Sequence, residues 1–228
     1  MFQDGWRLAP PNPEPYPSGM NPLVSIIVPT YLRAELLMAR SLPSAMNQTY
    51  TNLDIHVVGD GTDQATVDAM ATVTDPRVRF TNIERQVYPD DPIWAWNVRG
   101  SQAINFGLDH AIGPWVSTLG DDDELTPNSI EMLLDAAYEK DVDLIYGRSE
   151  IVGSGFLGDG HPRHAGQTNH SVWRLDDTRM DLECYADRRL PNDWDFLERY
   201  IAKHSWGFIP VVVHRYFPAT NVPWASPT

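Results

Sequence analysis

The chain of 228 residues is 42% hydrophobic and 11% aromatic, enough for one α/β domain with a buried core but too short for two full domains. Its 17 basic and 31 acidic residues give a formal net charge of -14, which argues against binding to a phosphate backbone, so nucleic acid is not an expected partner. Cys184 is the only cysteine, and this excludes an intrachain disulfide and a cysteine-based zinc site.

The first segment, residues 1–22, is predicted to be a proline-rich arm outside the core. Its six prolines forbid a helix and favour an extended, polyproline-like chain. Such an arm can clasp a second copy of the chain, so a homo-oligomer is left open.

Residues 23–147 alternate between short apolar runs and helical patterns. This alternation predicts an α/β fold in a single Rossmann-like domain, with a mostly parallel central sheet and helices on both faces. The strands are expected at Val24–Val28, Leu53–Val58, Val78–Phe80, Trp115–Leu119 and Val142–Tyr146, and the helices at Arg33–Met46, Thr62–Ala71, Trp96–Ala111 and Pro127–Lys140.

Residues 148–228 show a weaker pattern. The segment from Val152 to Gly166 contains five glycines and predicts an irregular loop. Regular structure is expected to return as a helix over Asp193–Lys203 and a strand over Phe208–Val213.

Polar residues follow three of the predicted strands, at the strand ends where open parallel sheets bind their ligands. The three segments are Pro29-Thr30-Tyr31, Gly59-Asp60-Gly61 and Gly120-Asp121-Asp122-Asp123-Glu124. We therefore expect them to meet in one ligand site.

The acidic run after the fourth strand suggests a metal site. Its neighbouring carboxylates repel one another, and a divalent cation such as Mn²⁺ or Mg²⁺ would neutralise them while keeping positions open for phosphate oxygens. An acidic, solvated start of the helix at Pro127 explains the cluster alone equally well.

Asp60 stands between two glycines that let a ligand approach the backbone closely. Its carboxylate can accept a hydrogen bond from a base N–H or a ribose hydroxyl. The same tripeptide makes ordinary turns, so it is a weak signal by itself.

The order and spacing of several motifs resemble the opening of glycosyltransferase family 2. They are VSIIVPTYLR over residues 24–33, QTY over 48–50, IHVVGDGTD over 55–63, Arg99, NFG over 105–107 and the acidic cluster with its trailing proline. The resemblance covers roughly residues 23–147. It implies the GT-A fold, a nucleotide-sugar donor, usually a UDP-sugar, and Mn²⁺ or Mg²⁺ as cofactor.

The resemblance also implies roles for the residues of the nucleotide pocket. The position of Asp60 recognises the base in this family, Thr30 and Arg33 line the pocket, and Arg99 lies near the diphosphate. Pro29 and Tyr31, which flank Thr30, are expected in the same pocket.

The metal motif of the family, counted back from the trailing proline, falls on Gly120-Asp121-Asp122. Asp122 is therefore the expected metal ligand, Asp123 a supporting one, and Asp121 a candidate for ribose contacts. His214 follows the last predicted strand, where some GT-A enzymes place a metal-binding histidine. A histidine at such a place is more often a packed or surface residue.

The catalytic base of an inverting enzyme of this family is expected at an acidic pair that opens a helix. Here Asn192-Asp193-Trp194-Asp195 occupies that place, and Asp193 is the match, with Asp195 as a less suitable second choice. An ordinary helix cap is the competing explanation, because Asn and Asp are both preferred there.

The chain departs from the family at Gly59 and Gly120, which replace aspartates, and at Leu32, which replaces an asparagine. The predicted activity is transfer of a sugar, of the hexosyltransferase kind, to an unidentified acceptor that residues 148–228 would bind. The alternative is a catalytically inactive GT-A protein that binds sugars or nucleotides or serves as a scaffold.

No apolar run approaches the roughly 20 residues that a membrane helix needs, and the N-terminus lacks a signal-peptide pattern. A cytoplasmic location is the default expectation, with contact to a membrane surface through tryptophans left open.

Overall fold

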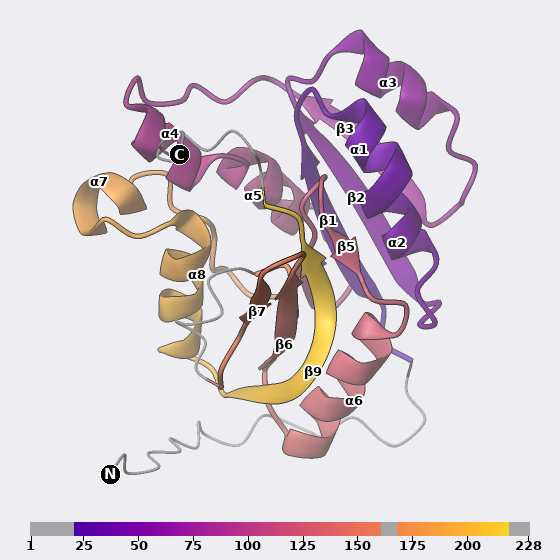
Figure 1. Cartoon of the computed structure of the whole chain (residues 1–228), viewed down its shortest axis with the longest axis vertical. Helices are drawn as coiled ribbons and strands as arrows, with labels where there is room; N and C mark the ends of the chain where they lie inside the picture. The colour runs from indigo at the N-terminus through magenta and orange to yellow at the C-terminus, as the bar shows by residue number, and fades with distance from the viewer. Residues whose placement is uncertain (1–20, 161–167, 219–228) are drawn as a thin grey trace.

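The computed structural model describes residues 21–160 and 168–218, and these ranges form one α/β domain around a twisted sheet (Figure 1). The predicted arm lies outside them, apart from its last two residues. The strands follow the order β3-β2-β1-β4-β8-β6-β9-β5 across the sheet, and β7 pairs with β6. Their bounds are β1 Val24–Thr30, β2 Leu53–Asp60, β3 Val78–Ile83, β4 Trp115–Thr118, β5 Glu124–Leu125, β6 Leu144–Ile151, β7 Gly155–Leu157, β8 Ser171–Arg174 and β9 Trp206–Tyr216.

The first four strands form a parallel sheet whose carboxyl ends lie at one edge. Strand β1 is at its centre and pairs with β2 and β4, and Thr30 at its end is level with Gly59 on β2. Strand β1 is almost wholly buried because helices cover both of its faces, and its near-continuous apolar run is typical of such a strand.

The remaining strands extend the sheet with a mixed pattern. Strand β8 runs antiparallel to both β4 and β6, and β9 runs parallel to β6. At the periphery, β5 pairs antiparallel with β9, and β7 pairs antiparallel with β6. The prediction of a mostly parallel sheet is confirmed, and antiparallel pairing is confined to β5, β7 and β8 within the described ranges.

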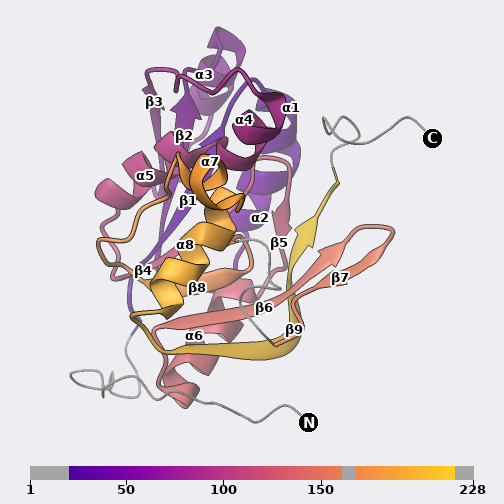
Figure 2. The same cartoon turned by 90° about the vertical axis from the view of Figure 1, so that its left-hand side faces the viewer.

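Helices cover both faces of the sheet, as predicted (Figure 2). One apolar cluster packs α2, α6 and their neighbours against one face, and a second packs α5 and α8 against the other. The helices are α1 Ala34–Leu36, the π-helical turn η1 Leu37–Ser41, α2 Leu42–Met46, α3 Gln64–Ala71, α4 Pro92–Val98, α5 Ser101–Asp109, α6 Ser129–Lys140, α7 Cys184–Arg188 and α8 Asn192–Ile201.

The structure corrects the sequence prediction in several places. The helix expected over Trp96–Ala111 is broken into α4 and α5 at Gly100, whose φ of +75° is in the left-handed region that favours glycine. The glycine-rich segment contains a short strand, β7, which forms a hairpin with β6. Strands β5 and β8 and helix α7 were not predicted.

In the described ranges, no helix combines the length and the apolar character needed to cross a membrane.

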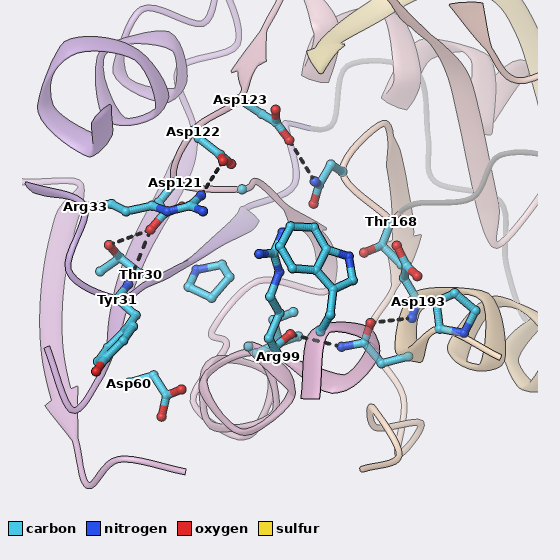
Figure 3. Close-up of a pocket in the computed structure, with 18 of the residues that line it drawn as sticks. Thr30, Tyr31, Arg33, Asp60, Arg99, Asp121, Asp122, Asp123, Thr168 and Asp193 are labelled. Carbon is cyan, nitrogen blue, oxygen red and sulfur yellow. Dashed lines mark hydrogen bonds and ion pairs between the residues drawn. The ribbon is translucent and has the colours of Figure 1, made fainter. Parts of the chain in front are cut away.

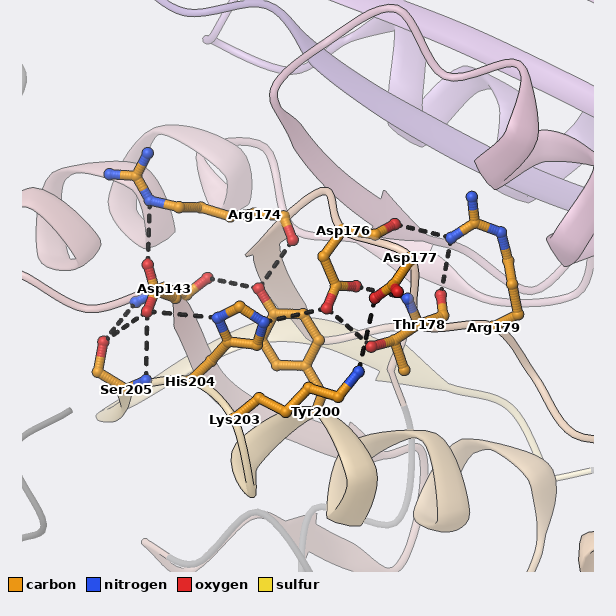
Figure 4. A network of polar contacts seen from close by, with 10 residues as sticks. All are labelled: Asp143, Arg174, Asp176, Asp177, Thr178, Arg179, Tyr200, Lys203, His204 and Ser205. Atoms are coloured by element: carbon orange, nitrogen blue, oxygen red, sulfur yellow. Dashed lines mark hydrogen bonds and ion pairs between the residues drawn. The ribbon is translucent and has the colours of Figure 1, made fainter. Parts of the chain in front are cut away.

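A polar network fastens the end of helix α8 to the sheet (Figure 4). His204 stacks on Tyr200 with ring centroids 4.3 Å apart, and its Nε2 lies 3.0 Å from Asp176 Oδ2. Asp143 accepts hydrogen bonds from the Ser205 backbone N–H and hydroxyl at 3.2 and 2.9 Å. These contacts fix the direction of the helix whose other end carries Asp193.

Candidate active site

A cavity of about 450 Å³ opens at the carboxyl ends of the parallel strands. Of the predicted site residues, all except His214 line it: Pro29, Thr30, Tyr31, Arg33, Asp60, Arg99, Asp121, Asp122, Asp123 and Asp193. Figure 3 shows the acidic loop, Asp60 and Asp193 on three different sides of this pocket. The topology therefore brings together segments that lie up to 164 residues apart, from Pro29 to Asp193.

Asp60 ends strand β2 at the bottom of the pocket and is only 2% exposed. Its Oδ1 accepts from the Gln86 backbone N–H at 2.8 Å, and its Oδ2 accepts from Arg85 at 2.6 Å and from the Tyr88 hydroxyl at 2.5 Å. The Arg85 guanidinium also lies 3.3 Å from the centroid of the Tyr31 ring. A flat aromatic face and a fixed carboxylate thus lie side by side.

Asp121 occupies the centre of the acidic loop and joins it to the end of β1. Its Oδ2 accepts from the Thr30 hydroxyl at 2.9 Å and from the Tyr31 backbone N–H at 3.3 Å. Arg33 forms ion pairs with Asp121 and Asp122. Burial raises the pKa of Asp121 to about 6, although Arg33 acts to lower it.

Asp123 points away from Arg33, toward the end of β9. It is 2% exposed, and its Oδ1 accepts from the Phe217 backbone N–H at 3.0 Å. His214 is fully buried behind it, with Nε2 at 3.4 Å from Asp123 Oδ2 and Nδ1 at 2.7 Å from the Ser149 hydroxyl. The Nε2 atom makes no hydrogen bond to any residue that the structure describes.

Arg99 lies on the turn between α4 and α5, with its guanidinium 3.3 Å from the centroid of the Trp96 ring. Burial lowers the pKa of Arg99, and the charge of Arg33 acts in the same direction. Arg33 and Arg99 therefore face the same cavity, which Arg85 lines as well, and a multiply charged anion between Arg33 and Arg99 is favoured.

Asp193 lies in the first turn of α8, at the side of the pocket opposite the acidic loop. Burial raises the pKa of its carboxyl to about 7, while the Trp194 backbone N–H at 3.0 Å and the charge of Arg99 act to lower it. Asp195 lines no part of this pocket, because it is buried in ion pairs with Arg188 and Arg199. Of the two aspartates, only Asp193 can therefore meet a ligand in the cavity.

Several lining residues were missed by the sequence prediction, among them Arg85, Tyr88, Trp96, Asn192 and Tyr216. Arg85 and Tyr88 follow β3 in a segment without regular structure, and no pattern marks them. Trp96 precedes Arg99 by three residues, a spacing that places two side chains on one helix face, so it could have been found.

Among the described residues, no group of three or more His, Cys, Asp or Glu side chains is arranged to hold a metal ion. Any cation here would take its remaining ligands from a bound molecule or from water, as Mg²⁺ commonly does.

The model of glycosyl transferase family 2 matches residues 25–188. The UDP-Glc:alpha-D-GlcNAc-diphosphoundecaprenol beta-1,3-glucosyltransferase WfgD of Escherichia coli is 28% identical to the chain, over 57% of this chain and 47% of its own length. The chain spans less than half the length of the curated relatives it matches.

Solved structures show the same fold at low sequence identity. S. aureus TarS (residues 1–349) in complex with UDP has a TM-score of 0.69 and 13% identity, covering 86% of this chain and 60% of that chain. The mannosyltransferase PcManGT from Pyrobaculum calidifontis, in complex with GDP-Man and Mn²⁺, has a TM-score of 0.64 and 16% identity, covering 95% and 62%. The expected GT-A fold is confirmed, and because the family model matches well over half of its residues, the chain belongs to glycosyltransferase family 2.

Proposed function

We propose that the protein transfers a sugar from a UDP-sugar to an acceptor hydroxyl with inversion at the anomeric carbon. The observation that carries the proposal is that Asp60, the two cations Arg33 and Arg99, and Asp193 line one pocket. A nucleoside diphosphate sugar has a base, a doubly charged diphosphate and a reacting anomeric carbon in that order, and the lining residues suit these parts.

The base of the donor would lie against Tyr31 with its N–H donating to Asp60. Two observations support this: Tyr31 and Asp60 line the same pocket, and the Tyr31 side chain is exposed. The choice of uridine rests on the family and on TarS, which binds UDP.

The diphosphate would lie between Arg33 and Arg99, close to the acidic loop. The residues that would hold a divalent cation are Asp122 and Asp123, with His214 beside Asp123. The fit rests on the His214 Nε2 atom, which is buried, makes no hydrogen bond within residues 21–160 and 168–218, and lies next to a carboxylate oxygen. A bound Mn²⁺ or Mg²⁺ would stabilise the negative charge that grows on the leaving diphosphate.

Asp193 would act as the general base. The acceptor oxygen forms a bond to the anomeric carbon, the bond from that carbon to the phosphate oxygen breaks, and UDP leaves with the electron pair. The acceptor proton passes to the Asp193 carboxylate. A pKa of about 7 suits this role, because the group is partly ionised at neutral pH and still basic enough to take a proton.

The test has two stages. A thermal-shift panel of UDP, GDP, dTDP and CDP with and without Mn²⁺ should show the largest stabilisation with UDP and a smaller one after chelation, since a ligand of the folded state raises stability by mass action. UDP release from UDP-sugars should then depend on Asp122 and Asp193, and Asp177→Asn, at a side chain 92% exposed, is the control. Donor binding without turnover on any acceptor would support the inactive alternative.

A further inference from the structure

The side chain of Asn192 links the start of helix α8 to the turn between helices α4 and α5. Its amide group donates to the Ser101 hydroxyl at 2.8 Å and to the Arg99 carbonyl oxygen at 3.3 Å. Its own oxygen accepts from the Asp193 backbone N–H at 2.9 Å. One amide therefore connects Asp193 with the turn that carries Arg99.

These contacts differ from those of a helix cap. A capping side chain accepts from the N–H group two or three residues further along the same helix. Asn192 instead uses both of its donor bonds on residues that are 93 and 91 positions away in the chain. The Asn192 amide therefore connects helix α8 with the turn between helices α4 and α5.

The Arg99–Gly100–Ser101 turn, which Asn192 contacts, is itself held in place. Gly100, between Arg99 and Ser101, has a φ of +75°, which restricts the position to glycine without strain. Its N–H donates to the Tyr88 hydroxyl at 3.0 Å, and Tyr88 in turn donates to Asp60 at 2.5 Å. An unbroken run of contacts thus leads from the floor of the pocket to the backbone of Asp193.

From this geometry we infer that Asn192 is a positioning residue, which fixes the Asp193 carboxylate by fastening its backbone to the Arg99–Gly100–Ser101 turn. The inference rests on the proposed function, because Asp193 is the base there. Asn192 takes no proton itself. It sets where the carboxylate stands relative to Arg99, the charged group that faces Asp193 from the turn.

The test compares Asn192→Ala, Asn192→Asp and a matched control, Asn128→Ala. Asn128 also lies at the start of a helix, directly before α6, makes no capping bond and is exposed. We expect Asn192→Ala to lower kcat between about 10-fold and 100-fold, because small displacements of a catalytic group have effects of this size, while the KM for the donor stays within about twofold. The control should match the wild type.

The pH dependence provides a readout that a purely structural role would not move. In Asn192→Ala the carboxyl of Asp193 gains access to water, so the acid limb of the kcat profile should move to lower pH. In Asn192→Asp a second carboxylate lies beside Asp193, and the limb should move to higher pH. Melting temperatures, compared with the control, verify that the variants are folded.

An NMR titration of the Asp193 carboxyl in the ligand-free protein separates this inference from the proposed function. The titration should show a lower pKa of Asp193 in Asn192→Ala and a higher one in Asn192→Asp, whether or not the wild type turns over a UDP-sugar. If Asp193 titrates alike in the wild type and both Asn192 variants, and kcat per folded molecule is unchanged where turnover is observed, the inference is wrong.

Discussion

Arg33 contacts the carboxylate of Asp122 although 89 residues separate them in the chain. The same guanidinium nitrogen lies 3.3 Å from Asp121 Oδ1. The parallel order of β1 and β4 brings the two loops together, and it also concentrates negative charge at one point of the pocket. Arg33 balances part of that charge through its ion pairs with Asp121 and Asp122.

The first prediction concerns this balance. Arg33→Gln should lower the free energy of unfolding by about 1 to 2 kcal/mol, because two neighbouring carboxylates lose a charged hydrogen-bond donor that is itself partly exposed. Mn²⁺ should then stabilise the variant more than the wild type. Urea denaturation with and without Mn²⁺ measures both effects. Arg215→Gln, at a side chain 52% exposed, is the control, and a variant as stable as the wild type would contradict the prediction.

The second prediction concerns Asp193. Asp193→Asn should lower kcat by about 10²-fold to 10⁴-fold, the usual contribution of a general base, while UDP binding persists. The wild-type rate should fall as the pH drops below about 7, where the carboxyl takes up a proton. Steady-state rates measured between about pH 5.5 and about pH 9 would show this limb in the wild type alone, and a limb of the same position in the variant would contradict the role of Asp193.

The same variant has a consequence for stability. The pKa of Asp193 in the folded protein is above its ordinary value of about 4, so ionisation destabilises the fold as the pH rises from about 4 to about 7. Asp193→Asn should therefore be more stable than the wild type at pH 8 and equal to it near pH 4. Thermal unfolding at the two pH values measures this difference, and a variant less stable at pH 8 would argue against a raised pKa of this carboxyl.

The sequence predicted the first half of the fold well because its strands are buried on both faces. Strand β1 is a near-continuous apolar run, and the polar residues that follow β1, β2 and β4 had to meet at the same sheet edge. The pocket therefore contains nearly every residue chosen from the sequence.

The missing parts depend on contacts that no local pattern reveals. Strand β5 has two residues and exists through its pairing with β9. Strand β8 has four and is defined by its insertion between β4 and β6. The contact of Asn192 with Arg99 could not be predicted, because it depends on how helices α4 and α8 lie in space. In the sequence alone, Asn192 has the pattern of a helix cap.

The third prediction concerns the floor of the pocket. Asp60→Asn keeps the shape of the side chain but removes the charge that Arg85 contacts. If Asp60 accepts the base N–H, UDP should bind about 10-fold more weakly, equivalent to 1.4 kcal/mol. Titration calorimetry with UDP and with CDP measures the change. CDP, whose base offers an acceptor at that edge, should lose less affinity, and equal losses for both nucleotides would show that Asp60 does not read the base.

The fourth prediction concerns the network at the far end of helix α8. His204→Ala removes the ring that stacks on Tyr200 and the contact to Asp176, and it should lower the free energy of unfolding by about 1 to 2 kcal/mol. Although burial acts to raise it, the pKa of Asp176 is lowered by hydrogen bonds from Thr178 and His204. That contribution to stability is present above the ordinary pKa of about 4 and is lost as the pH falls through the folded value.

The difference in stability between His204→Ala and the wild type should therefore be smaller below pH about 4 than at pH 7. Lys203→Ala is the matched control, because Lys203 pairs with Asp177 at 3.5 Å between side chains that are 54% and 92% exposed, and such surface pairs contribute little. Urea denaturation at the two pH values measures both variants. If the lysine variant loses as much stability as the histidine variant, the network does not hold the helix, and the direction of α8 must depend on its apolar face alone.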